Sequence, residues 1–318
     1  MAVSTKEIKG RIKSIKNTKK ITKAMEMVSA AKMKKAVDAA QNTRMYASRA
    51  LAILDSLAEV NEPDCPLVQK REVQKVLMVV ISSNKGLCGG FNANIAKHVR
   101  KILADQDRLL RYVEDGELSQ DTQKELEVDV LGVGKKSVSI AKKFNLNAVA
   151  VFDTIGERPG VNDIFPISSM IRDLFITEKY DKVVMIYTRF VSGLEQVPKV
   201  RQLLPVSSKD LHKILEDHAD QSGEEEQDRS LPIACYHLEP SREDVLNTVL
   251  PMLLDAQVHH GILESAASEH SARMVAMKNA GEAAGDMQEE LTQMYNKARQ
   301  AAITQEIAEI AGGAAALE

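Results

Sequence analysis

The sequence predicts an α/β domain carried between the two halves of a long antiparallel coiled coil. Both ends of the chain show apolar residues at spacings of three and four, which is the period of one face of an α-helix. Between them, short runs rich in Val alternate with helical stretches, which is typical of an α/β domain. Aromatic residues make up only 4% of the 318 residues and charged residues 27%, a composition that favours long helices over a thick core.

Several classes of protein are disfavoured by composition. The net charge of -3 gives no overall field that would attract nucleic acid. Cys65, Cys88 and Cys235 are odd in number and form no CxxC, which argues against a disulfide framework or a zinc site and for a reducing compartment. No apolar run reaches about eighteen residues, and no apolar signal region opens the chain, so neither a transmembrane helix nor a signal peptide is expected.

The N-terminal segment, 1–62, is predicted to form one helix over residues 4–58. Ser4 is its expected N-cap, with Glu7 three residues later completing a capping box. The expected apolar stripe shifts phase near Thr18 and consists of Ile8, Ile12, Ile15, Ile21, Met25, Val28, Leu51, Leu54 and Ala58. Such a helix would be roughly 80 Å long and would need a partner along its length.

The C-terminal segment, 240–318, is the expected partner. Ser241 with Asp244 predicts the start of its helix, Pro251 a kink or its first turn, and Gly312-Gly313 its end. Its expected seam is rich in Ala and Met, so a second helix could approach closely. That seam consists of Met274, Met277, Ala280, Ala284, Met287, Leu291, Met294, Ala298, Ala301, Gln305 and Ala308.

The central α/β domain is predicted over 73–206, after a proline-containing linker at 59–72. A small, Rossmann-like sheet of the parallel type is expected, covered by helices. Its strands are expected at 76–82, 128–133, 148–152, 182–189 and 196–206. Its helices are expected at 92–111, starting from a cap at Asn92, at 135–144 and within 162–178.

The segment 207–230 is predicted to be a mobile surface insertion, because residues 216–228 hold seven acids and no base. Its removal is expected to leave assembly with partners intact. A short extended piece is expected after it, at 231–238.

No catalytic, cofactor or metal site is predicted. The glycine loop 85–90 follows a strand and precedes a helix, as a phosphate loop does, but it matches neither GxxxxGK[ST] nor GxGxxG, so a tight turn is favoured. Cys88 is the only candidate nucleophile near it, with no His or acid adjacent in sequence. His259 and His260 face different sides of a helix, and His270 lies nearly three turns further on, which is poor geometry for a metal.

The first 35 residues are strongly basic, with eleven Lys or Arg against two acids. A solvated helix face and a contact with an acidic protein both remain open. Nucleic acid is disfavoured because the segment lacks aromatic residues on which bases could stack.

Four stretches, in order along nearly the whole chain, resemble the gamma subunits of F-type ATP synthases. They are KEIKGRIKSIKNTKKITKAMEMVSAAKMKKA (6–36), GLCGGFN (86–92), QVPKVRQLLP (196–205) and ARMVAMKNA with YNKARQAAITQEIAEIAGGAAAL (272–317). The resemblance implies a non-catalytic central rotor shaft that couples proton-driven rotation to ATP synthesis or hydrolysis. It also implies, as partners, three alpha and three beta subunits, the epsilon subunit and the membrane ring of c subunits. No cofactor is implied, and the expected location is peripheral, at the cytoplasmic face of a bacterial inner membrane.

The same resemblance implies two sets of contact residues. The set facing the hexamer, including an acidic segment of the beta subunits, consists of Met25, Lys19, Lys20, Lys23, Arg273, Gln300 and Thr304. The set at the foot of the shaft, near epsilon and the ring, consists of Arg189, Gln196, Gln202 and Leu204. Two other functions remain as alternatives: a coiled-coil adaptor with a partner-binding α/β head, and a small-molecule enzyme built on the α/β domain.

Overall fold

The computed structural model describes residues 5–58, 65–105, 107–110, 126–156, 159–206 and 241–315, without the side chains of 42–58, 107–108, 161, 242–243 and 313–315. The predicted cap at Ser4, the insertion 207–230 and the extended piece 231–238 lie outside these residues. The chain divides into two compact units, residues 32–272 (the α/β unit) and residues 1–31 with 273–318 (the coiled-coil unit). Two long helices, α1 (Thr5–Ala58) and α7 (Arg242–Ala315), run through both.

The α/β unit is built on a five-stranded sheet in the order β3-β2-β1-β4-β5. Four strands are parallel: β1 (Lys75–Ile81), β2 (Glu127–Val133), β3 (Asn147–Phe152) and β4 (Lys182–Phe190). β5 (Gln196–Leu204) runs antiparallel to β4, so the prediction of a parallel-type sheet is wrong for this strand. The reason is the connection, because residues 191–195 are enough for a hairpin but far too few for a parallel crossover.

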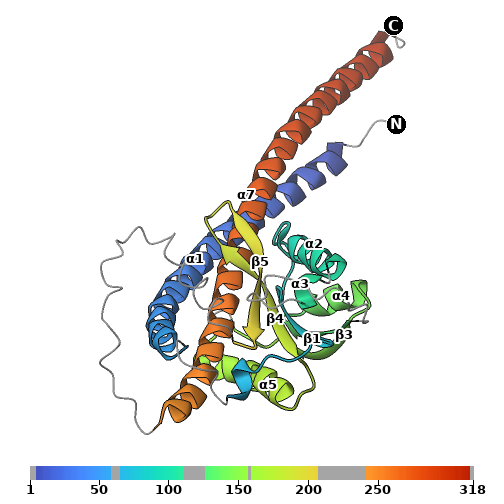
Figure 1. Ribbon diagram of the computed structural model, residues 1–318. Helices are drawn as coiled ribbons and strands as arrows, with labels where there is room; N and C mark the ends of the chain where they lie inside the picture. The colour runs from blue at the N-terminus through green and yellow to red at the C-terminus, as the bar shows by residue number, and fades with distance from the viewer. Residues whose placement is uncertain are drawn as a thin grey trace. The chain divides into compact units, whose positions relative to one another are not determined.

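Helices cover both faces of this sheet (Figure 1). One face packs against α5 (Val161–Ile176), the short 3-10 helix η1 (Pro66–Val68) and the first part of α7. The other packs against α2 (Phe91–Ala104), α3 (Asp107–Leu110) and α4 (Lys136–Lys143). Alternate residues of β1 are buried in the hydrophobic cores on the two faces of the sheet. Both sides of this central strand are therefore apolar, and its sequence is a continuous apolar run.

α7 begins inside the core of the α/β unit. Leu246, Leu250 and Leu254 are at most 5% exposed and lie in the same cluster as α5 and the sheet. The predicted start is confirmed: the Ser241 hydroxyl accepts the backbone N–H of Asp244 at 3.1 Å and donates to its Oδ2 at 2.6 Å. The helix continues through Pro251, so the suggestion that this proline marks its first turn is wrong.

The helix predicted at 92–111 is shorter and starts earlier. Gly90 is the N-cap of α2, and the helix ends at Ala104, before α3. Asn92 is therefore not a cap. Its side chain turns back to the end of β1, where Oδ1 accepts the Ser83 backbone N–H at 3.2 Å and Nδ2 donates to the Ser83 hydroxyl at 2.7 Å.

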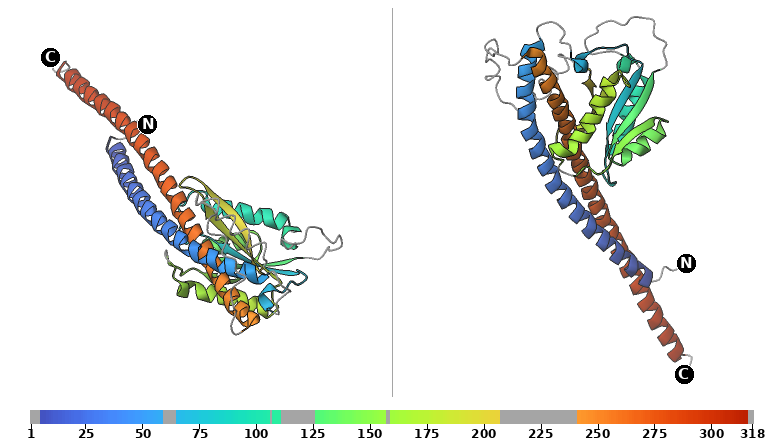
Figure 2. Two further views of the ribbon diagram at one scale, coloured as in Figure 1. Left: turned by 60° about the vertical axis from the view of Figure 1, so that its left-hand side comes forward. Right: turned by 90° about the horizontal axis from the view of Figure 1, so that it is seen from below.

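In the coiled-coil unit, the first part of α1 lies beside the later part of α7 (Figure 2). A Cβ placed on Gly281 would lie 3.2 Å from the Thr22 hydroxyl, and one placed on Gly285 would lie 2.9 Å from the Lys19 amino group. Going from Gly281 to Gly285 along α7, the facing residue on α1 changes from Thr22 back to Lys19. The two helices therefore run antiparallel, as predicted.

The seam differs from the predicted one. On α1, Ile8, Ile12 and Ile15 do face inward, but the buried row then continues through Thr22 and Ser29 without a phase shift, leaving Ile21 and Val28 more than half exposed. On α7 the inward row is Met277, Gly281, Ala284, Gln288, Leu291, Tyr295 and Ala298. Ala280, Met287 and Met294 are exposed instead, as are Ala301, Gln305 and Ala308.

Around Gly281 the seam consists of small and weakly polar residues, because the two backbones approach closely there. Gly281 and Ala284 leave space for the facing helix, and the buried Thr22 hydroxyl is satisfied within its own helix by the Lys19 carbonyl at 3.0 Å. The larger Ile21, Val28 and Met287 side chains lie on the outer surface instead.

Candidate functional site: the outer surface of the coiled coil

Exposed apolar side chains line the outside of the coiled-coil unit. On α1 they are Ile21, Met27 and Val28, at 60%, 59% and 52% exposure. On α7 they are Met287, Met294, Ile303, Ile307 and Ile310. Every described residue from Arg299 to Gly312 is exposed, so this end of α7 is accessible to solvent on all sides. Exposed apolar side chains in this number are typical of a site of contact with another protein.

Basic residues lie beside these apolar ones on α1. Lys19, Lys20 and Lys23 are all exposed, and the Lys23 amino group is paired with Glu26 at 2.9 Å. Met25, next to this pair, is only partly exposed. The surface therefore combines mobile positive charge with apolar side chains, which suits a partner of negative charge without fixing one rigid geometry.

The other predicted hexamer contacts lie in different settings. Gln300 and Thr304 are exposed one turn apart, and the Thr304 hydroxyl donates to the Gln300 carbonyl at 2.9 Å. The Gln300 side-chain amide therefore remains on the surface. Arg273, by contrast, is only 7% exposed, so little of its side chain is available to a partner.

The glycine loop of the α/β unit is packed on itself. Cys88 is 3% exposed, and its sulfur lies 3.2 Å from the Asn92 side-chain nitrogen and 3.8 Å from the Ser83 hydroxyl. The nearby cavity, lined by Gly90, Phe91, Asn94, Thr188, Gln196, Pro198 and Ala272, has a volume of about 60 Å³. Ligand sites for drug-sized molecules start near roughly 300 Å³, so a nucleotide does not fit here.

The histidines of α7 have local roles. His259 Nε2 lies 2.9 Å from the Pro159 carbonyl oxygen, and burial lowers the pKa of His259. His260 is buried beside Glu264. Within the described residues, no group of three or more His, Cys, Asp or Glu is placed to hold a metal ion. Nor does any helix in that part of the chain have a stretch long and apolar enough to cross a membrane.

Comparison with known proteins gives matches along the whole chain. The family model described as ATP synthase matches residues 4–317. The ATP synthase gamma chain of Roseiflexus sp. (strain RS-1) is 38% identical over 317 residues, covering 99% of this chain and 98% of the relative. That of Roseiflexus castenholzii (strain DSM 13941 / HLO8) is 37% identical over the same length. The chain belongs to the ATP synthase gamma chain family.

Solved structures agree on the fold of this family. A chain of the Euglena gracilis mitochondrial ATP synthase (OSCP/F1/c-ring, rotational state 3) matches with a TM-score of 0.60 at 20% identity, covering 98% of this chain and 94% of that one. A chain of the Tetrahymena thermophila mitochondrial ATP synthase (central stalk/cring) matches with a TM-score of 0.56 at 24% identity, covering 82% and 99%.

The foot residues expected from the gamma subunit resemblance fall at opposite ends of β5. Arg189 pairs with Val197, next to Gln196, at the hairpin end. Leu204 pairs with Val183 at the other end, roughly 25 Å away along the strand. Leu204 is fully buried, and Gln202 is 8% exposed and donates its amide to the Pro205 carbonyl at 2.8 Å. The side chains of Gln202 and Leu204 are therefore buried in the α/β unit, whereas those of Arg189 and Gln196 are partly exposed.

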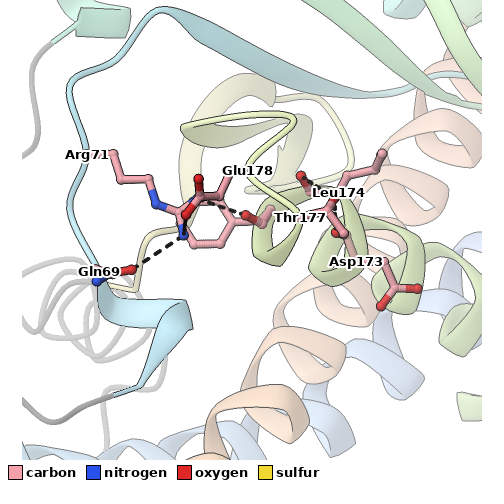
Figure 3. Close-up of polar contacts among 7 residues, drawn as sticks. Gln69, Arg71, Asp173, Leu174, Thr177 and Glu178 are labelled. Atoms are coloured by element: carbon pink, nitrogen blue, oxygen red, sulfur yellow. Dashed lines mark hydrogen bonds and ion pairs between the residues drawn. The ribbon is translucent and has the colours of Figure 1, made fainter.

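Sequence reasoning missed the contacts that join Arg71, in the segment that leads into β1, to the C-terminal end of α5 (Figure 3). Arg71 donates to the Phe175 carbonyl at 3.0 Å, lies over the Phe175 ring at 5.1 Å from its centroid and pairs with Glu178 at 3.6 Å. The positive charge also sits favourably at the C-terminal end of the helix. Nothing local to Arg71 in the sequence indicates a contact more than a hundred residues away.

Proposed function

We infer that this chain is the central-stalk rotor subunit of an F-type ATP synthase. The observation that carries this inference is the 38% identity to a gamma chain over 99% of this chain. The chain would bind no nucleotide and would carry out no chemistry of its own. It would transmit torque between proton-driven rotation in the membrane and the catalytic subunits.

The coiled-coil unit supports this function through its surface. A shaft inside a ring of three alpha and three beta subunits needs contacts that hold it in place yet let it turn. Exposed Met and Ile side chains give non-directional contact, and lysine side chains give screened attraction to an acidic segment of beta. Because one helix pair has no threefold symmetry, it touches the three beta subunits differently and stabilises a different conformation of each.

The α/β unit is proposed to be the foot, in contact with epsilon and the ring of c subunits. Arg189 and Gln196 are the foot residues with exposed side-chain surface, so they are the better candidates for such contacts. The chain would then be peripheral, at the cytoplasmic face of a bacterial inner membrane.

The direct test is affinity purification of the tagged full chain from gently solubilised native membranes, followed by partner identification and an ATPase assay. Alpha, beta, epsilon and c subunits with ATPase activity are expected. Recovery without a nucleotide-hydrolysing partner would overturn the proposal and favour the adaptor alternative.

A second test addresses the contact at Met25. Met25→Lys adds charge at a partly buried position beside the Lys23–Glu26 pair, where the family resemblance places the acidic segment of beta. We expect fewer protons pumped per ATP hydrolysed in membrane vesicles, with Asn147→Lys as a charge-matched control at an exposed position of the α/β unit. Unchanged pumping in Met25→Lys would rule out the role given to Met25.

A further inference from the structure

Three serines of α7 lie on one side of the helix and are buried against the end of β4. They are Ser265, Ser268 and Ser271, here called the serine row, and each is at most 2% exposed. A spacing of three residues keeps side chains on the same side of a helix. Their hydroxyl groups are therefore placed to act together on the part of the α/β unit that α7 covers here.

The first two serines take the place of a neighbouring strand. β1 pairs with β4 only as far as Ile186, so no strand among the described residues lies beside β4 on that side further along. The N–H and C=O groups of such an edge need other partners. The Ser265 hydroxyl accepts the Thr188 backbone N–H at 3.1 Å, and the Ser268 hydroxyl donates to the Thr188 carbonyl at 3.1 Å. α7 thus completes the hydrogen bonding of this strand end.

Ser271 holds the hairpin beyond the strand end. Its hydroxyl donates to the Gly193 carbonyl at 2.7 Å and accepts the side-chain amide of Gln196 at 3.2 Å. Gly193 lies in the connection between β4 and β5, and Gln196 is the first residue of β5. The serine row therefore attaches one continuous stretch, from the end of β4 to the start of β5, to α7.

These contacts differ in kind from those that hold the first part of α7. Leu246, Leu250 and Leu254 pack in the hydrophobic core, and apolar contacts are non-directional. A hydrogen bond, by contrast, weakens steeply when its angle or length changes. If α7 slid or turned against β4, the backbone groups of Thr188 and Gly193 would lose their partners together. Thr188 is only 2% exposed, and a polar group left unpaired at such a position is costly.

We propose that the serine row is the joint that holds α7 against sliding and turning in the α/β unit, so that the two rotate together. Its members are positioning residues, because they act through β4 and the hairpin. This inference rests on the proposed rotor function, in which the α/β unit is the foot and α7 continues into the coiled-coil unit. Loosening the joint is expected to lose part of the rotation of the foot before it reaches the coiled coil.

The first measurement is backbone hydrogen exchange in the purified full chain. Ser265→Ala removes the acceptor of the Thr188 N–H, so this amide is expected to exchange at least tenfold faster. Ser168→Ala is the matched control, because Ser168 is also buried in a helix but its hydroxyl donates to carbonyls of that same helix, α5. Unchanged exchange at Thr188 in Ser265→Ala would refute the joint.

The second measurement compares proton pumping with ATP hydrolysis by the assembled complex in membrane vesicles. Ser265→Ala combined with Ser268→Ala is expected to pump at least twofold fewer protons per ATP hydrolysed, and Ser265→Ala alone to give an intermediate ratio. Ser168→Ala is expected to match the wild type. Thermal unfolding identifies the variants that remain folded, and an unchanged ratio in either folded serine-row variant would refute the joint, even if its hairpin exchanges faster.

Failure of the inference and failure of the proposed function give different results. A wild-type chain that assembles into an ATP-hydrolysing, proton-pumping complex, with the same pumping ratio in the serine-row variants, overturns only the joint. A wild-type chain that forms no such complex overturns the rotor function and, with it, the joint.

Discussion

The observed seam of the coiled coil predicts that a disulfide can join its two helices at one particular pair of positions. A Cβ added to Gly281 would lie 4.0 Å from the Cβ of Thr22. Disulfides span Cβ separations of about 3.5–4.5 Å, so Thr22→Cys with Gly281→Cys should oxidise readily. The bridge would close most of the chain into one loop, for which chain entropy gives an upper limit of about 5–6 kcal/mol of stabilisation.

The assay is the rate of oxidation by a mild oxidant, followed as a change in mobility on non-reducing gels and mapped by mass spectrometry. The background carries Cys235→Ser, and the native thiols Cys65 and Cys88 are buried. The comparison pair is Ile21→Cys with Ala280→Cys, two positions of the seam that the sequence pattern predicts. Both are exposed in the structure, so this pair should close at least tenfold more slowly.

Faster closure of the Ile21 and Ala280 pair would show that the inward row is the one expected from the sequence, and would refute the seam described here. The same disulfide also bears on the proposed function. Both cysteines of the Thr22 and Gly281 pair lie within the rotor, so the bridge should leave ATP hydrolysis by the assembled complex unchanged. A loss of hydrolysis that a reductant reverses would contradict a shaft that turns as one body.

Two further predictions concern the α/β unit. Gly134 has φ +88°, and a Cβ there would collide with the Ser82 carbonyl oxygen, so Gly134→Ala should lower the free energy of unfolding by about 2 kcal/mol or more. A Cβ at Gly156 has no atom within 4 Å, so Gly156→Ala should change it by no more than about 0.5 kcal/mol. Urea unfolding measures both, and equal effects would refute the reasoning. Burial and the 2.6 Å hydrogen bond to Asp129 raise the pKa of Tyr180 above its ordinary value of 10.0, so the folded state holds this proton more tightly and stability should fall as the pH rises above about 10. Thermal unfolding from pH 8 to 11 should show a steeper loss in the wild type than in Tyr180→Phe, and parallel curves would contradict the shift.

Periodicity in the sequence was enough to predict which segments are helices and strands. The continuous apolar run of β1 and the alternation of strands with helices arise from local repeats that each segment carries by itself. The cap at Ser241 was likewise predictable, because its partner lies three residues away. The long terminal helices were predicted for the same reason, together with their need of a partner.

The role of the first part of α7 depends on the tertiary structure. The antiparallel direction of β5, by contrast, follows from the short connection 191–195, which the sequence shows. That Leu246 to Leu254 join the core of the α/β unit follows only from where α7 meets α5 and the sheet. The serine row of α7 is of the same kind, since its partners lie 75 to 80 residues away along the chain.

The sequence by itself determined that this protein has two long helices, an α/β domain between them and the motifs of the gamma chain family. Only the tertiary structure decided which side of each helix faces inward. Hydrophobicity alone favoured Ile21, Val28, Met287 and Met294 for the seam, but these four side chains lie outward, and the close approach at Gly281 leaves room only for small residues near it. A local pattern records how apolar each position is, whereas packing depends on how near the facing backbone comes, and that distance exists only in the folded chain.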